Sequence, residues 1–123
     1  TPQDYSNSNL AGPQWDKLFY HAQESAKLAA SYPGLPMGTT QIILEHHGHP
    51  QGRGFLYPPN SSLGLHSKIF IIAEELALGL LRFQLSRQKG SSSLLAEVKI
   101  KYYHPWMLEA LSAFQQALSK SKV

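Results

Sequence analysis

The spacing of apolar residues over the first third of the chain predicts two amphipathic helices. Apolar side chains recur at three- and four-residue steps over residues 14–31, namely at Trp15, Leu18, Phe19, Ala22, Ala26 and Ala29. Such positions gather on one face of an α-helix. Pro13 suits the first turn of this helix, and the run YPGLP over residues 32–36 ends it. A second helix is predicted over residues 39–47, with Thr39 and Thr40 as candidate caps and with Ile42, Ile43 and the ring of His46 on its apolar face.

The remainder of the chain predicts a long loop followed by three more helices. Residues 48–63 are rich in glycine and proline and have no regular apolar period, so we expect a loop. A third helix is predicted over residues 64–85, with an apolar face made of Ile69, Ile72, Ala73, Leu76, Leu80 and Phe83. Shorter helices are predicted over residues 93–100 and 105–119, the last with Trp106, Leu108, Leu111, Phe114 and Leu118 as apolar positions. Val98 and Ile100 give a weak indication of a strand. The predicted fold is therefore all-α, a helical bundle of about five helices with one long Gly/Pro-rich loop.

Length and composition fit one globular domain over residues 1–123. The chain has 123 residues, of which 42% are hydrophobic and 15% are charged. It contains no cysteine, which excludes a disulfide scaffold, a zinc–thiolate site, an iron–sulfur cluster and thiol catalysis, and which fits a reducing cytosol. Because the chain begins at Thr1 and not at Met, we interpret it as processed or as a piece of a longer protein.

The charge is unevenly distributed along the chain. Residues 1–81 hold four basic and six acidic side chains, whereas residues 82–123 hold seven basic and two acidic ones. The basic segment could meet phosphates, although such a segment is more commonly a solvated helical surface. The balance is too weakly basic to indicate binding of duplex nucleic acid. No membrane span is expected, because the longest apolar run, over residues 69–81, is interrupted by Glu74 and Glu75.

Histidines are the candidate chemical groups. His21 falls in the middle of the first predicted helix, and His46 and His47 form a doublet at the end of the second. Glu74 falls within the apolar face of the third helix, where a carboxylate is costly unless it is paired, protonated or bound to a metal. Neutral imidazoles and a carboxylate from packed helices could form a metal site.

Less specific interpretations of these residues stay open. Glu74 could pair with Lys68, and Glu75 is expected to be solvated. Adjacent helical residues diverge by about 100°, so the doublet can serve one site only at a helix end or across two metals. The other three histidines, His49, His66 and His104, are expected to be ordinary surface or hydrogen-bonded residues.

The loop after the doublet adds a second clue. Gly52 and Gly54 flank Arg53, and glycines allow a tight turn and a close approach to a ligand. Arg53 could then face a phosphate. A lone Gly-x-Gly is weak evidence for a phosphate-binding loop. Here the evidence is stronger, because the motif directly follows the histidine doublet.

The segment IILEHHGHPQGRGF over residues 42–55 resembles the signature of HD-GYP domains, a helical branch of the HD phosphohydrolase superfamily. That signature is a His-His doublet followed by Gly-x-Gly-Tyr-Pro. The resemblance continues outside the loop: His21, which lies 25 residues before His46, corresponds to an upstream helical histidine, and IFIIAE over residues 69–74 corresponds to a helix whose acidic residue here is Glu74. The run YHPW over residues 103–106 resembles the aromatic-Asp-Pro sequence that begins the last helix of the family.

This resemblance implies an HD-domain-like fold and a metal-dependent phosphodiesterase of bacterial signalling that hydrolyses cyclic di-GMP in the cytoplasm. It implies divalent metal ions, iron or manganese, two or three if the full site is present. His21, His46, His47 and Glu74 match the metal-ligand positions, whereas Gly52, Arg53 and Gly54 match the region beside the nucleotide. The expected partner is a cyclic dinucleotide or another phosphodiester.

Departures from the family pattern support an alternative function. Gly48, Gln51, Phe55 and Leu56 replace the usual family residues, and the chain contains no His-Asp dipeptide, so it matches only the C-terminal part of such a domain. The alternative is a catalytically inactive signalling module that binds a nucleotide or a partner protein. A plain helical interaction domain with structural histidines is a third hypothesis.

Overall fold

The protein is all-α. A computed structural model describes residues 12–86 and 91–121, and within these ranges it contains five α-helices and one 3-10 turn. The chain forms two compact units, residues 1–67 and residues 68–123, each considered by itself below. Within the described ranges, no helix has the combined length and apolar character that crossing a bilayer requires. The predicted single domain over 1–123 stays a prediction.

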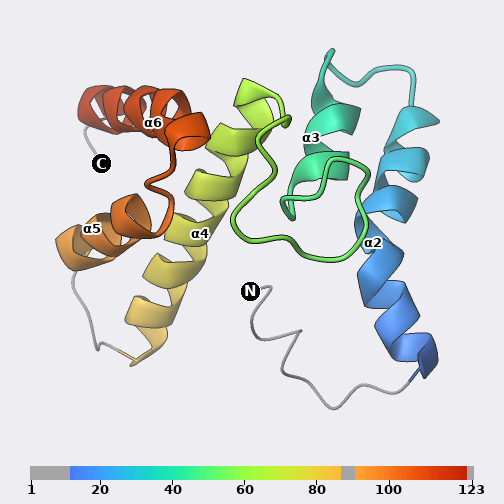
Figure 1. Cartoon of the computed structure of the whole chain (residues 1–123), viewed down its shortest axis with the longest axis horizontal. Helices are drawn as coiled ribbons and strands as arrows, with labels where there is room; N and C mark the ends of the chain where they lie inside the picture. The colour runs from blue at the N-terminus through green and yellow to red at the C-terminus, as the bar shows by residue number, and fades with distance from the viewer. Residues whose placement is uncertain (1–11, 87–90, 122–123) are drawn as a thin grey trace. The chain divides into compact units, whose positions relative to one another are not determined.

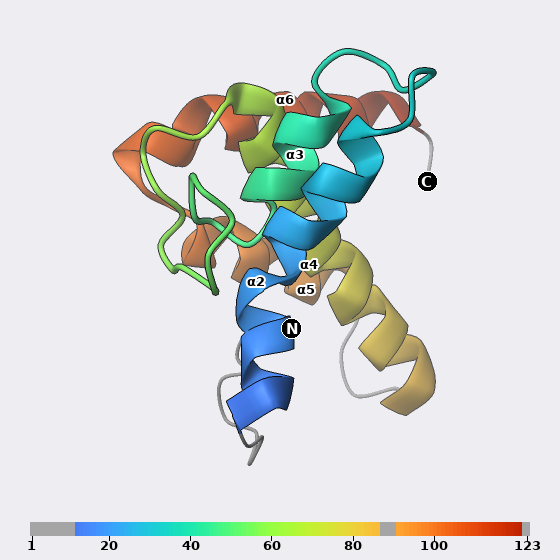
Figure 2. The same ribbon diagram turned by 90° about the vertical axis from the view of Figure 1, so that its right-hand side faces the viewer.

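The first unit is built on helices α2 (Gly12–Ala30) and α3 (Thr39–Glu45), which pack side by side (Figures 1 and 2). Ala22 and Ala26, one turn apart on α2, are buried, as their spacing predicted. Gly38, with a φ of 89°, is the N-cap of α3, and no side chain caps the helix. The predicted Thr39 and Thr40 caps are therefore wrong, because these residues already form the first turn.

The loop after α3 is fixed by backbone contacts. The Leu56 amide donates to the His47 carbonyl at 2.9 Å, and the Asn60 amide donates to the Gly48 carbonyl at 2.9 Å. Gly48 has a φ of 91°, and a Cβ there would lie 2.2 Å from the Leu56 carbonyl oxygen. A side chain at Gly48 would thus clash with backbone as well as strain its conformation.

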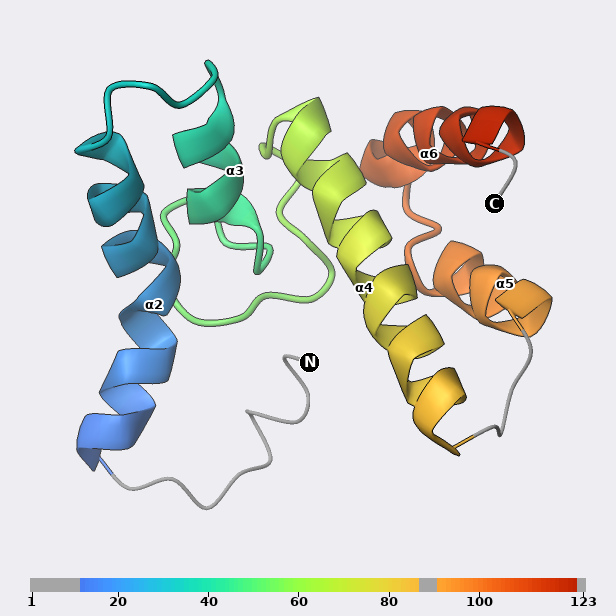
Figure 3. The same ribbon diagram turned by 180° about the vertical axis from the view of Figure 1, so that it is seen from behind.

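The second unit contains most of α4 (Leu65–Ser86), together with α5 (Ser91–Lys101), the 3-10 turn η1 (Pro105–Met107) and α6 (Leu108–Ser121) (Figure 3). The weak strand indication at Val98 and Ile100 is wrong, because both lie in α5, where Val98 is buried. The last predicted helix is divided, since η1 precedes α6.

The buried positions of the second unit differ partly from the predicted faces. On α4 the structure buries Ile72 and Leu76, as predicted, and also Ile71. At the start of the last helical segment, Met107 and Ala110 are fully buried, whereas Leu108, a predicted apolar contact, is 42% exposed. The 3-10 turn accounts for this difference, because its tighter winding shifts the helical phase that was assumed to begin at residue 105.

Candidate metal centre

Three histidines of the first unit converge. His21 lies on α2, His46 is the C-cap of α3, and His47 begins the loop. One ring nitrogen from each lies within 4.8 Å of the others, so the cluster could hold a metal ion. The structure thus brings together three of the four residues that the sequence predicted as metal ligands.

The doublet lies at the end of a helix, which explains how the side chains of both histidines can contribute to one site. Inside a helix, adjacent side chains diverge by about 100°. The helix ends at Glu45, and the rings of His46 and His47 lie with their centroids 3.9 Å apart. This meets the geometric condition stated above for a doublet that serves a single site.

The two Nε2 atoms of His21 and His47 are 3.2 Å apart. Two imidazole nitrogens bound to one tetrahedral ion with bonds of 2.0–2.1 Å would lie about 3.3 Å apart. The pair therefore has a spacing that fits a shared ion as well as a direct hydrogen bond. The donor set passes a first test of fit to a transition metal.

The ring of His46 is oriented by its own helix. Its Nδ1 lies 2.5 Å from the Ile43 carbonyl oxygen. Because a carbonyl oxygen can only accept, Nδ1 carries the proton and the lone pair of the neutral ring is on Nε2. Backbone acceptors commonly fix metal-binding histidines in this way.

The surroundings of His47 favour its uncharged form. Burial, together with the neighbouring His46 and His21, lowers the pKa of His47 to about 3. The neutral ring, which is the form that ligates metals, therefore predominates at His47 from mildly acidic to neutral pH. The ring of His47 is therefore available to bind a metal cation through its lone pair.

Two buried nitrogens of the cluster lack partners. The Nδ1 atoms of His21 and His47 are buried and have no hydrogen-bond partner among the described residues. An unsatisfied buried polar atom costs about 1–3 kcal/mol. With Nε2 of each ring at the ion, these Nδ1 atoms carry the protons, and the described part of the chain supplies no acceptor for them.

Phe55 forms an apolar wall of the cluster. Its ring centroid lies 4.6 Å from that of His47 and 6.5 Å from that of His21. Apolar walls restrict water and strengthen metal–nitrogen electrostatics. Phe55, which the sequence marked only as a departure from the family signature, is thus part of the site.

The glycine loop is held by its own amides. The Gly52 amide donates to the His49 carbonyl at 3.1 Å, and the Gly54 amide donates to the Phe19 carbonyl at 2.6 Å. Both glycines have positive φ, so their role is to allow the backbone conformation of this loop. Arg53, between them, is exposed, so its predicted contact with phosphate stays a prediction.

His49, expected to be an ordinary residue, stabilises the same loop. Its Nδ1 accepts hydrogen bonds from the amides of Gln51 at 3.0 Å and Arg53 at 3.3 Å. His66 is exposed, as expected, and the His104 ring stacks on Trp106 with centroids 5.2 Å apart. These three histidines are therefore structural or solvated.

The two glutamates of α4 differ. Glu74 lies on α4 in the second unit and is partly buried, and its role as a metal ligand stays a prediction. Glu75 was expected to be solvated, and this is wrong: its side chain is only 17% exposed and pairs with Lys101. The pairing depends on how α5 lies beside α4, which apolar periodicity does not predict.

Glu45 was missed by the sequence analysis. It is only 4% exposed, and its carboxylate accepts hydrogen bonds from the Gln41 side chain and, at 3.1 Å, from the Gly64 amide. It thus joins the end of α3 to the end of the loop and holds the segment that carries the doublet. In the sequence, only the position of Glu45 next to His46 could have indicated this role.

Comparisons with protein-family models, with curated proteins and with solved structures found no match.

Proposed function

We propose that this chain is a metal-dependent phosphodiesterase domain of HD-GYP type that acts on a cyclic dinucleotide, cyclic di-GMP, as a fragment or a divergent copy of such a domain. The observation that carries the proposal is the convergence of His21, His46 and His47. Their spacing in the sequence suggested the family, and their proximity in the first unit is what a shared metal requires.

Each residue has a definite part in this proposal. The three histidines hold iron or manganese through neutral imidazole nitrogens. When bound, such ions acidify water and neutralise phosphate charge. Arg53 contacts a phosphate oxygen through its exposed guanidinium. Phe55 limits the access of water to the cluster.

The proposed reaction is hydrolysis of one phosphodiester bond. The hydroxyl of water becomes bonded to phosphorus, the P–O ester bond breaks, and the leaving ribose oxygen takes up a proton. No oxidant or further reactant is needed.

A hydrolysis assay tests the proposal. The protein is incubated with Mn²⁺ or, without oxygen, with Fe²⁺, and conversion of cyclic di-GMP to the linear dinucleotide is followed by chromatography. We expect turnover by the unaltered chain and by His66→Ala, whose substitution lies at an exposed histidine, and loss of turnover in His47→Ala. Metal-loaded protein that leaves cyclic di-GMP and other phosphodiesters intact would contradict the proposal.

The alternative is an inactive signalling module that binds a nucleotide or a partner protein, and it is favoured by a departure from the family signature at the cluster itself, where Phe55 contacts His47. The amides of Gly52 and Gly54 are already used within the loop, so a nucleotide would have to bind through other groups. Calorimetry that detects cyclic di-GMP binding by metal-loaded protein, without conversion in the same sample, would support this alternative over the enzyme.

A further inference from the structure

The connection between α2 and α3 forms an exposed apolar surface that the proposed function does not use. Its residues 31–38, called the tip from here on, are all exposed, and Figures 1 and 2 show the connection at one end of the two helices. Met37 is fully exposed, Tyr32 is 64% exposed, and Leu35 is exposed as well. Leu28, one turn before the end of α2, is 75% exposed. Large apolar side chains are therefore concentrated on a short surface segment.

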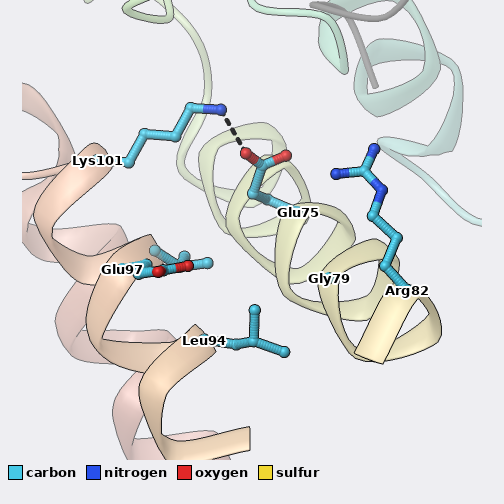
Figure 4. A pocket seen from close by; sticks show the side chains of 7 residues that line it. Glu75, Gly79, Arg82, Leu94, Glu97 and Lys101 are labelled. Atoms are coloured by element: carbon cyan, nitrogen blue, oxygen red, sulfur yellow. Dashed lines mark hydrogen bonds and ion pairs between the residues drawn. The ribbon is translucent and has the colours of Figure 1, made fainter. Parts of the chain in front are cut away.

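The tip lies in a stretch of the chain without charge. Residues 28–44 contain no Asp, Glu, Lys, Arg or His, although 15% of all residues are charged. The exposed pair Glu24–Lys27, 3.5 Å apart on α2, comes just before this stretch. By contrast, α4 and α5 present charged side chains to each other, as Figure 4 shows for Glu75 and Lys101. A surface that enters lipid must avoid charge, whereas a protein-binding surface usually keeps a polar rim, so the tip suits lipid better.

The polar groups of the tip also suit an apolar environment. A hydrogen-bond donor without an acceptor is costly in lipid, because no water replaces the missing partner. The amide of Tyr32 and the hydroxyl of Ser31 donate to carbonyls of α2, at 3.0 and 2.6 Å. The amide of Thr39 donates to the Pro36 carbonyl at 3.2 Å, and Pro33 and Pro36 have no amide hydrogen. Much of the desolvation cost of the tip is therefore already met within the chain.

The tip is separated from the histidine cluster by the length of α3. That helix begins at Thr39, directly after the tip, and His46 is its C-cap. At a rise of 1.5 Å per residue, these two positions lie about 10 Å apart along the axis. Contact of the tip with a membrane surface would therefore leave the cluster on the water side.

We propose that the tip inserts into the surface of an uncharged lipid bilayer and attaches the first unit to membranes reversibly. Leu35 and Met37 enter the boundary of the acyl chains, and the ring of Tyr32 lies at the level of the headgroups. The Glu24–Lys27 pair stays in water. The attraction is hydrophobic and does not require anionic lipid. Because one myristoyl chain binds bilayers with an association constant of about 10⁴ M⁻¹, we expect about tenfold weaker binding from these short side chains.

A fluorophore on the tip tests this proposal, since the chain has no cysteine that would compete for the label. Met37→Cys protein, labelled with a dye sensitive to polarity, is titrated with phosphatidylcholine vesicles up to about 10 mM lipid. The control is Lys17→Cys with the same dye, exposed on α2 about 20 Å before its end. We expect a saturable blue shift only at position 37, equal at low and high salt. No saturable shift at position 37, or an equal one at position 17, would overturn the proposal.

Sedimentation of unlabelled protein with the same vesicles excludes an effect of the dye. Met37→Asp places a charge at a fully exposed position, so it should fold normally and reduce the bound fraction at least about fivefold. Ser25→Asp adds the same charge at an exposed position of α2 outside the tip and should bind like the unaltered chain. Equal binding by Met37→Asp and the unaltered chain would overturn the proposal.

A second copy of the chain is the other candidate occupant of the tip. Dimers in analytical ultracentrifugation without lipid that Met37→Asp abolishes, with no sedimentation on vesicles, would overturn the lipid proposal in favour of self-association. The His46→Ala/His47→Ala double variant should bind vesicles like the unaltered chain. The outcome for lipid is therefore independent of the outcome for metal or cyclic di-GMP.

Discussion

The two units of the chain place their polar side chains by different means. In the first unit, a loop with three left-handed glycines, Gly48, Gly52 and Gly54, follows the histidine doublet, and the clustered groups are three imidazoles. In the second unit, two regular helix faces present side chains of opposite charge, and Glu75 compensates Lys101 directly. The first arrangement suits a cation held by neutral nitrogens, whereas the second is balanced before any ligand binds. Backbone changes should therefore damage the first unit most, and single charge changes the second.

The largest expected effect concerns Gly48. A Cβ at Gly48 would lie 2.2 Å from the Leu56 carbonyl oxygen, so Gly48→Ala should lower the free energy of unfolding by about 3 kcal/mol or more. The control is Gly38→Ala, because Gly38 has a similar φ of 89° with nothing within 4 Å of an added Cβ, and strain alone should cost about 1 kcal/mol. Urea denaturation measures both variants. Equal losses would show that the loop contact does not hold the site.

The second effect concerns the ion pair of the second unit. Lys101→Met removes the partner of Glu75, whose side chain is only 17% exposed, and should cost about 2 kcal/mol of unfolding free energy. Lys99→Met, on the exposed side of the same helix, should change it by less than about 0.5 kcal/mol. If the two variants unfold at the same urea concentration, the pair does not stabilise this unit.

The third prediction is a pH dependence of the first unit. The folded pKa of His47 is about 3, below the value of 6.5 for the free side chain, so below pH 6.5 the unfolded chain binds more protons than the folded one. Stability of the metal-free protein should therefore fall as the pH decreases from 7 to 4. Solvent screening of the partly exposed ring reduces the effect to about 1–2 kcal/mol. His47→Gln should give a flatter profile in urea titrations, and parallel profiles would contradict the assigned pKa.

The smallest effect is a gain of stability in the second unit. Gly79→Ala replaces a glycine within α4 by the best helix former, and its Cβ meets Leu94 at ordinary contact distance. The free energy of unfolding should rise by about 0.5–1 kcal/mol. Thermal denaturation measures this change, and a lower melting temperature would mean that the two helix faces are already closely packed at Gly79.

The local order of the helices was predictable, and the contacts between distant segments were not. Apolar periodicity with Pro and Gly boundaries predicted residues 14–31 and 64–85 as helices, and the structure has Gly12–Ala30 and Leu65–Ser86. The strand indication at Val98 failed because β-branched residues also occur in helices when tertiary packing buries them.

The histidines of the candidate site could be predicted from the sequence. His21, His46 and His47 were singled out by their positions on the predicted helices and by the resemblance to HD-GYP domains, and the structure brings these three together. The burial of Glu45 and the pairing of Glu75 could not be predicted, since each depends on a segment far along the chain. In the sequence, Phe55 stood out only as a departure from the family signature. Its contact with His47 could not be predicted, because it requires the loop to fold back.

The most direct test of the central claim, that the histidine cluster binds metal, is the metal content of the purified chain after incubation with Mn²⁺ or Fe²⁺ and removal of unbound ions. We predict at least one equivalent per chain in the unaltered protein and in the His66→Ala control, and its loss in the His46→Ala/His47→Ala double variant, with circular dichroism confirming that all three proteins are helical. A folded protein that retains no metal, or a double variant that retains as much as the unaltered chain, would contradict the claim.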